Sequence, residues 1–409
     1  MDKKKNENYK ILIPILILIF FPFPSKVLGY STALYISDMV LISYLLFGAI
    51  NNRYKIPLNN TTYLLIGMMV VNIIGIIIGV LKGYAEIRQL MEIVRTSEWI
   101  IIYIYNYNLI KRNQEVETAF LKSIKVILLL LIPFVIIELF NLPGKNLLRN
   151  FYELSKSGNI YQYYNRISGP LRNPNFLGIF MIIILNFVLI SNYKLMTKVL
   201  FAIISIGIIY FTGSRTAIII SIITIIITCL TNLKINRSRK EIIKSIIAII
   251  TILLVCLLVI QKNSKLFYSV RINELKDDMD DFSGRSQIWE KYEKDIQANI
   301  LVGNGIVKSN EIIFDNLYIQ YMYYYGIVGI IVLICLFVKN IAKIYKLYIL
   351  EKDLKRKKFV LGIFAIQIII IVSGVTIQIL DSLQIFYFYI LAMAYIDVRY
   401  SNLTDVKLK

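Results

Sequence analysis

The residue whose type and position most clearly indicate a chemical role is Arg215, which stands in the run Thr212-Gly213-Ser214-Arg215 between two long apolar stretches. No other charged residue lies near it in the sequence on either side. An ionised arginine costs about 3 kcal/mol near the centre of a bilayer, so it is seldom kept there for packing alone. The face of the membrane that holds Arg215 is therefore predicted to hold the active site, with Ser214 as a neighbouring substrate-binding residue.

A second arginine-bearing segment runs from Arg166 to Asn175 and also contains Arg172, Asn173 and Pro174. Its proline and glycine residues prevent a regular helix, and Asn175 is predicted to cap the helix that follows. One interpretation is a tight turn with two solvated arginines. The other is an anion-binding cradle, in which the arginines and the amides at the helix start face a phosphate.

A third candidate segment is Ser283–Ile296. Four apolar side chains share one face of the helix predicted here: Ile288, Trp289, Tyr292 and Ile296. This pattern is typical of an amphipathic helix that lies at the bilayer interface. Ser283 can cap the helix, which places Arg285 in the first turn, where the helix dipole disfavours a cation. Arg285 either shares that end with a bound anion or is a surface residue whose charge reaches water.

The fourth segment, Asp315-Asn316-Leu317-Tyr318, opens an apolar stretch. Asp315 can cap the helix, or it can act as a carboxylate general base at the membrane edge. Tyr318, Tyr321 and Tyr325 follow at helical spacing on one face. They predict either an aromatic belt at the interface or a wall on which a sugar or lipid stacks.

The chain contains no histidine, which excludes His-ligated metals, Ser-His-Asp triads and imidazole bases. The acidic run Asp277–Asp281 suggests a magnesium–diphosphate site, but such a site needs a second carboxylate cluster, so we expect a solvated loop. Cys229, Cys256 and Cys335 fall in apolar runs and are predicted to be small core residues. We predict no metal and no other cofactor.

Composition makes the chain an all-α polytopic membrane protein, because 57% of its 409 residues are hydrophobic and its apolar runs recur at membrane-spanning length. The first run follows a lysine-rich start and resembles a signal peptide, but further apolar runs follow at once, so we expect it to be the first span. The twelve predicted spans are Tyr9–Phe23, Tyr30–Ile50, Tyr63–Leu81, Thr96–Ile110, Ala119–Phe140, Phe176–Ser191, Lys198–Phe211, Thr216–Leu230, Ile242–Ile260, Leu317–Val338, Phe359–Leu380 and Leu383–Val398.

Twelve spans and a cytoplasmic N-terminus concentrate lysine and arginine on the inner segments, whereas the outer segments are nearly balanced in charge. This is the positive-inside pattern, so most of the net charge of +20 is a topology signal and a nucleic-acid partner is not predicted. Two long outer loops, 141–175 and 261–314, break the pattern of short connections and are predicted to be functional. The turn that holds Arg215 lies on the same outer face in this topology.

Taken in order, the motifs resemble those of the O-antigen polymerase and ligase superfamily. The resemblance covers Arg166–Gly329 together with the plan of spans, and the ordered set is more specific than any one motif. The motifs are Asn173-Pro174-Asn175 before a span, Thr212–Arg215 between spans, Gly284-Arg285 with Trp289 in the large loop, Gly303-Asn304-Gly305, and Asp315-Asn316 with Tyr318.

The resemblance implies a GT-C-like, metal-independent glycosyltransferase in the bacterial cytoplasmic membrane with its site facing outward. Its implied partners are an undecaprenyl-diphosphate-linked oligosaccharide, the lipid bilayer and a chain-length regulator protein. By this likeness, Arg215 and Arg285 match the arginines that bind the donor diphosphate. Asp315 stands where ligases and some polymerases carry histidine, which argues against a lipopolysaccharide ligase and leaves the identity of the base open.

The resulting hypothesis is a polysaccharide polymerase, O-antigen or capsular, in which Asp315 accepts the acceptor proton and Asn316, Tyr318 and Tyr321 orient the sugar. The main alternative is a flippase for the same lipid-linked oligosaccharides. A flippase is expected to carry charges along its spans, whereas the span centres here are almost free of charge. A ligase that attaches finished glycans to another acceptor is the second alternative.

Overall fold

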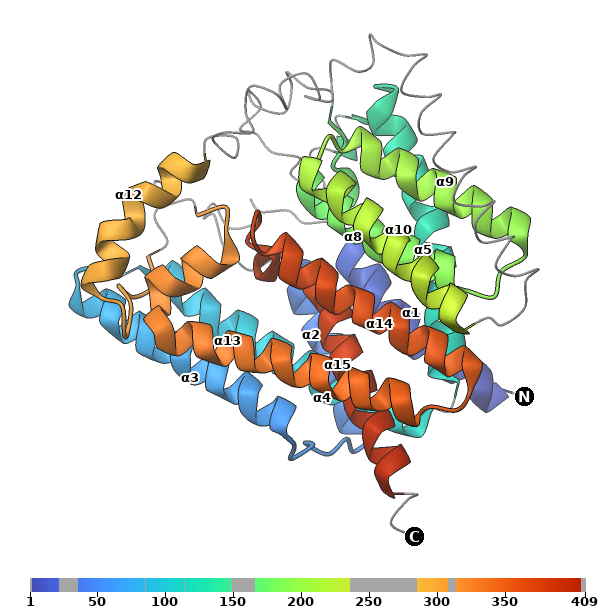
Figure 1. Cartoon of the computed structure of the whole chain (residues 1–409), viewed down its shortest axis with the longest axis horizontal. Helices are drawn as coiled ribbons and strands as arrows, with labels where there is room; N and C mark the ends of the chain where they lie inside the picture. Colours follow the sequence, from blue (N-terminus) through green and yellow to red (C-terminus); the bar gives the residue numbers. More distant parts are fainter. Residues whose placement is uncertain are drawn as a thin grey trace. The chain divides into compact units, whose positions relative to one another are not determined.

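The computed structural model describes residues 2–21, 36–84, 86–113, 115–145, 147–148, 166–235, 285–307 and 314–405. Every regular element in these ranges is a helix, which confirms the predicted all-α class (Figure 1). The predicted span Ile242–Ile260, the acidic run Asp277–Asp281 and Ser283 lie outside the described residues, as does most of each predicted long loop. The chain forms two compact units that alternate along the sequence.

The first unit comprises Met1–Pro24, Asn113–Asn273 and Leu347–Ser373. Its central helix is α8 (Pro174–Ile190), which is buried along almost its whole length and packs against four of the others (Figure 1). Asn186 of α8 donates its side-chain amide to the carbonyl oxygen of Gly362 at 2.9 Å, so a polar pair fixes the register with α14. The other helices are α1 (Asp2–Phe20), α5 (Val116–Leu139), α9 (Leu195–Phe211), α10 (Arg215–Ile235) and α14 (Leu354–Ser373).

The second unit comprises Ser25–Arg112, Glu274–Lys346 and Gly374–Lys409. Its core is the pair α4 and α15, because α15 is buried from Leu383 to Val398 except at Gln384 and makes its most extensive packing with α4. Helices α3 and α13 run side by side (Figure 1). The helices are α2 (Ile36–Asn51), α3 (Asn60–Leu81), α4 (Met91–Arg112), α12 (Arg285–Ala298), α13 (Leu317–Leu350, to Lys346 in this unit) and α15 (Leu383–Asp405).

The predicted apolar runs that fall on described residues all overlap helices. Three of the described helices, α3, α5 and α13, are long and apolar enough to cross a membrane. Helix α14 ends at Ser373 and is followed by a short 3-10 helix, Ile379–Asp381, rather than continuing to the predicted Leu380. Cys335 is exposed on α13, so its prediction as a core residue is wrong.

Helix α13 is longer than the predicted Leu317–Val338 and is broken at Gly326, where φ is 61°. The break frees backbone groups that pair with the preceding segment. Asn304 and Gly305 donate their amides to the carbonyl oxygens of Tyr323 (2.6 Å) and Tyr324 (3.1 Å), and the Ile327 amide donates to Ile300 at 2.8 Å. The Gly303-Asn304-Gly305 turn therefore stabilises the kink through backbone hydrogen bonds.

Candidate functional site

Within the first unit, the structure joins the Arg166–Asn175 segment, called the arginine loop below, to the Thr212–Arg215 turn. Nε of Arg166 donates to the carbonyl oxygen of Thr212 at 2.6 Å, and its Nη2 donates to Oδ1 of Asn175 at 2.9 Å. The Ile167 amide also donates to the carbonyl oxygen of Phe211 at 3.2 Å. Two motifs that lie about 40 residues apart in the sequence thus form one polar cluster, as expected if both serve one site.

Close helix packing sets the position of this turn. A Cβ on Gly178 of α8 would lie 2.6 Å from Cβ of Ala217 and 3.4 Å from Cβ of Ser214, so only glycine permits the observed approach of α8 and α10. Ser214 is buried, and its hydroxyl accepts from the Ala217 amide at 3.3 Å. Ser214 therefore caps α10. Arg215, the first residue of that helix, remains partly exposed.

The cap of α8 is Asn173 rather than the predicted Asn175. Oδ1 of Asn173 accepts from the Asn175 amide at 2.8 Å, and Pro174 occupies the first helical position, where its missing N–H is not needed. Asn175 instead accepts from Arg166. Arg172, just before the cap, adopts a positive φ of 67° and is partly exposed.

Glu138, at the end of α5, was not predicted as part of the site. Its carboxylate accepts three hydrogen bonds from the arginine loop: the Ser168 amide at 3.0 Å, the Ser168 hydroxyl at 3.1 Å and the Gly169 amide at 2.8 Å. A carboxylate that binds backbone amides forms strong, charge-assisted hydrogen bonds. Glu138 therefore holds the loop that carries Arg166 and Arg172. The sequence signal for it is a lone acidic residue at the end of an apolar run.

In the second unit, Asn316 caps α13. Its Oδ1 accepts from the amides of Tyr318 at 2.8 Å and Ile319 at 3.1 Å. The interpretation of Asp315 as the helix cap is therefore wrong. Asp315 precedes the helix in a left-handed conformation, with φ 45°, and is partly exposed. Its role as a general base stays a prediction.

The predicted amphipathic helix is present as α12, with Arg285 as its first residue. Part of its apolar face packs on the protein. The ring of Tyr292 lies 4.9 Å from that of Phe314 and 5.5 Å from that of Tyr323, and Nε1 of Trp289 donates to the carbonyl oxygen of Phe314 at 3.3 Å. Tyr292 therefore packs against the protein, and the position of α12 at the bilayer interface stays a prediction.

The tyrosines of α13 also face inward more than expected. Tyr321 and Tyr325 are buried, with ring centroids 5.1 Å apart, whereas Tyr318 is partly exposed. The interpretation as an aromatic belt is wrong for the two buried residues, because a belt requires contact with the membrane interface. Whether Tyr318 and Tyr321 orient a sugar stays a prediction.

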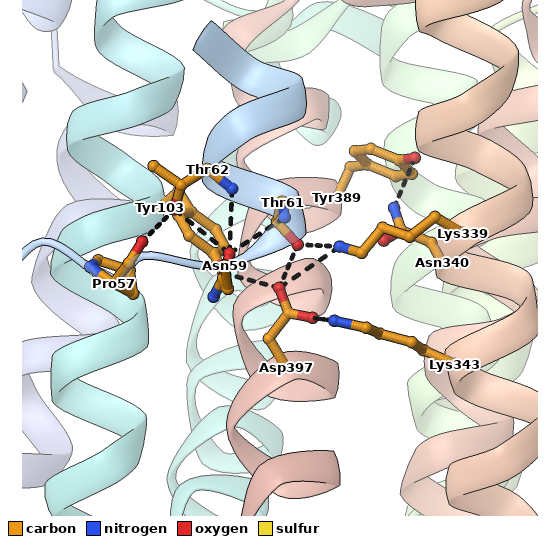
Figure 2. A network of polar contacts seen from close by, with 10 residues as sticks. All are labelled: Pro57, Asn59, Thr61, Thr62, Tyr103, Lys339, Asn340, Lys343, Tyr389 and Asp397. Carbon is orange, nitrogen blue, oxygen red and sulfur yellow. Dashed lines mark hydrogen bonds and ion pairs between the residues drawn. The ribbon is translucent and has the colours of Figure 1, made fainter. Parts of the chain in front are cut away.

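Sequence reasoning also missed a buried ionic network around Asp397 (Figure 2). Nζ of Lys343 lies 2.5 Å from Oδ1 of Asp397, and Nζ of Lys339 lies 3.5 Å from Oδ2. The Tyr103 hydroxyl donates to the same carboxylate at 2.7 Å, and the Thr61 hydroxyl also binds it. These residues come from α3, α4, α13 and α15, and the lysines lie toward the opposite end of α13 from Asn316. The network therefore links α3, α4, α13 and α15 within the second unit.

Arg215 belongs to the first unit, whereas Arg285 and Asp315 belong to the second. Their predicted convergence on one substrate therefore stays a prediction. The arrangement within each unit is nevertheless informative. The first unit gathers the arginine loop and the Arg215 turn, and the second places Asp315 at the start of a kinked helix.

Comparison with known proteins gives one match, to the family model described as O-antigen ligase, over residues 200–334. The matched segment includes the turn of Arg215, the start of α12 at Arg285, and Asp315. No curated protein matches the chain significantly. Over residues 200–334 the chain therefore matches the O-antigen polymerase and ligase superfamily, as the order of its motifs predicts.

Proposed function

We propose that the protein is a polysaccharide polymerase of the bacterial cytoplasmic membrane, with its active site on the outer face. In the proposed reaction, the anomeric carbon of a glycan linked to undecaprenyl diphosphate is attacked by a hydroxyl of a second lipid-linked repeat unit. A new glycosidic bond forms, the bond from the anomeric carbon to the phosphate oxygen breaks, and undecaprenyl diphosphate leaves. The acceptor proton passes to the carboxylate of Asp315.

Negative charge grows on the diphosphate as it leaves, so prepositioned guanidinium groups stabilise the transition state more than the ground state. We assign this role to Arg215 and Arg285. Arg166 and Arg172 bind the remaining phosphate oxygens or the adjoining sugar, and Asn173 and Asn175 shape that part of the site. Ser214 holds the Arg215 turn through its cap of α10. Asn316, Tyr318, Tyr321 and Trp289 line the path of the acceptor sugar.

The observation that carries this proposal is the contact between the arginine loop and the Arg215 turn. Arg166 bonds to both Thr212 and Asn175, so two arginine-bearing segments are fixed beside the start of α8. A helix start with nearby arginines suits the binding of a phosphate group. The family match over residues 200–334 supports the reaction class.

Replacement of Arg215 by lysine tests the proposal. Lysine keeps the positive charge but loses the paired hydrogen bonds, so we expect turnover to fall by about 100-fold, as for loss of one transition-state donor. Cells with Arg215→Lys should contain normal amounts of membrane-inserted protein and single repeat units instead of a glycan ladder. A long ladder in these cells would show that Arg215 does not bind the diphosphate.

A glycan ligase is the second candidate, because the matching family model carries that description. The two activities leave different products when they are lost. Deletion of a polymerase leaves single repeat units, whereas deletion of a ligase leaves long chains on the lipid carrier. Analysis of the lipid-linked glycans in a deletion strain therefore separates them.

A further inference from the structure

A small pocket in the second unit lies between α4, the first turns of α13 and the 3-10 helix Ile379–Asp381. It is lined by Arg95 and Trp99 of α4, Gln320 and Tyr321 of α13, and Asp381. The predicted topology places all three elements at the outer face. The backbone amide of Gln320 donates to the carbonyl oxygen of Asn316 at 3.1 Å, so Gln320, which lines the pocket, lies one helical turn after Asn316.

Trp99 is the residue that points to a ligand. It is 2% exposed, and its ring packs 4.3 Å from that of Phe386. Its Nε1–H nevertheless has no hydrogen-bond partner among the residues that the structure describes. A buried donor without an acceptor is costly, and native proteins leave few such groups. Trp99 lines the pocket, so an acceptor atom bound there beside the indole N–H would satisfy this donor.

The charged residues of the pocket include both signs. Nη1 of Arg95 donates to the carbonyl oxygen of Asp381 at 2.8 Å and lies 3.4 Å from its Oδ1. The two side chains keep 17% and 30% of their surface exposed, so they remain accessible, and the carboxylate of Glu92 adds a further negative charge. A free anion would meet two carboxylates, and a cation would meet the guanidinium. A neutral group that both donates and accepts hydrogen bonds suits this mixture best.

The size of the pocket restricts the group further. Its interior has room for about one water-sized group, so it admits a single hydroxyl or hydroxymethyl arm and not a whole ring. We propose that this pocket binds a hydroxyl arm of a sugar in the acceptor repeat unit. The hydroxyl oxygen accepts a hydrogen bond from Nε1 of Trp99, and the hydroxyl donates a hydrogen bond to the carboxylate of Asp381 or Glu92. The assignment to the acceptor rests on the proposed polymerase function, because the pocket is lined by the first turns of α13, the helix that follows Asp315.

The test follows the melting temperature of the purified full-length chain as the glycan binds, because a ligand that binds the folded state raises it. The probe is the delipidated repeat-unit oligosaccharide, released by mild acid from the polysaccharide of the host cells. Titration into the purified full-length protein should produce a saturable rise in its melting temperature. Trp99→Phe, which keeps an aromatic ring and removes the Nε1–H donor, should weaken the apparent affinity by about tenfold, whereas Gln297→Ala, at an exposed residue of α12, should not.

A flat titration, or equal affinities for the Trp99→Phe and Gln297→Ala proteins, would overturn the proposal and leave the pocket to a resident water. If the Trp99→Phe protein cannot be purified, the same comparison is made with Asp381→Ala and Glu92→Ala, and equal affinities for both and for Gln297→Ala would overturn the proposal. The result is independent of polymerisation. A saturable titration together with a long ladder in Arg215→Lys cells would refute the proposed function alone, and a flat titration with a lost ladder would refute the pocket alone.

Discussion

Among single residues, those of the arginine loop and its polar contacts define the candidate site. Arg166, Arg215 and the asparagines around Pro174 could be selected from the sequence, because charged and turn-forming residues stand out in an apolar chain. Their hydrogen-bond partners could not be selected in this way. Asn175 was predicted as the cap that Asn173 provides, and Glu138 was missed because its three hydrogen bonds reach about 30 residues along the chain. Such long-range bonds have no local sequence pattern.

Glu138→Gln tests the hold on the arginine loop. The glutamine side chain has the same size, but its amide group presents a donor to the Ser168 or Gly169 amide, so at least one hydrogen bond is lost at a cost of about 1–3 kcal/mol. We expect a shorter glycan ladder with a normal amount of membrane protein.

Glu117→Gln is the matched control, since Glu117 lies at the opposite end of α5 and pairs with Arg356 at 3.5 Å. Equal ladders from the two variants and the unmodified chain would mean that Glu138 does not position the loop for the reaction.

At the scale of elements, the helices followed well from apolar periodicity, but the interruption of α13 did not. Gly326 lies in an apolar run that gives no local reason for a break, and the kink depends on pairing with the segment around Asn304. The same reason explains why the spacing of Tyr321 and Tyr325 could not decide between an aromatic belt and a stacking wall. Spacing assigns side chains to one face of a helix, but only packing determines what that face contacts.

Gly326→Ala tests the importance of the kink. A Cβ at this position would lie 2.5 Å from the backbone of Leu301, and φ is 61°, so we expect destabilisation of about 1–3 kcal/mol and a lower melting temperature in detergent. Gly207→Ala in α9 has open space around the new Cβ and should be neutral or slightly stabilising. Equal melting temperatures for the two variants would show that the left-handed conformation at Gly326 is not required.

At the scale of the whole molecule, composition and charge bias predicted an all-helical membrane protein, and three described helices have the length and apolarity to span a bilayer. The sidedness of the loops remains a prediction from the positive-inside pattern. The two alternating units were not predicted, because the order of apolar runs does not indicate which helices pack together.

Cysteine labelling tests the sidedness. A membrane-impermeant maleimide applied to intact cells, with the outer membrane permeabilised where one is present, should label Asn141→Cys and leave Asp353→Cys unlabelled until the cytoplasmic membrane is opened. Both substitutions belong in a background without Cys229, Cys256 and Cys335. The reverse pattern would place the arginine loop in the cytoplasm and exclude an outward-facing site.

The proposed function requires that Arg215 and Arg285 bind the same donor diphosphate. A double-mutant cycle on purified enzyme, with turnover of lipid-linked repeat units as the readout, tests it most directly. If the two arginines act together on one phosphate group, the Arg215→Lys/Arg285→Lys protein should be about as active as the less active of the two single variants. Losses that simply multiply would show that the two arginines act independently and would refute their binding to one diphosphate.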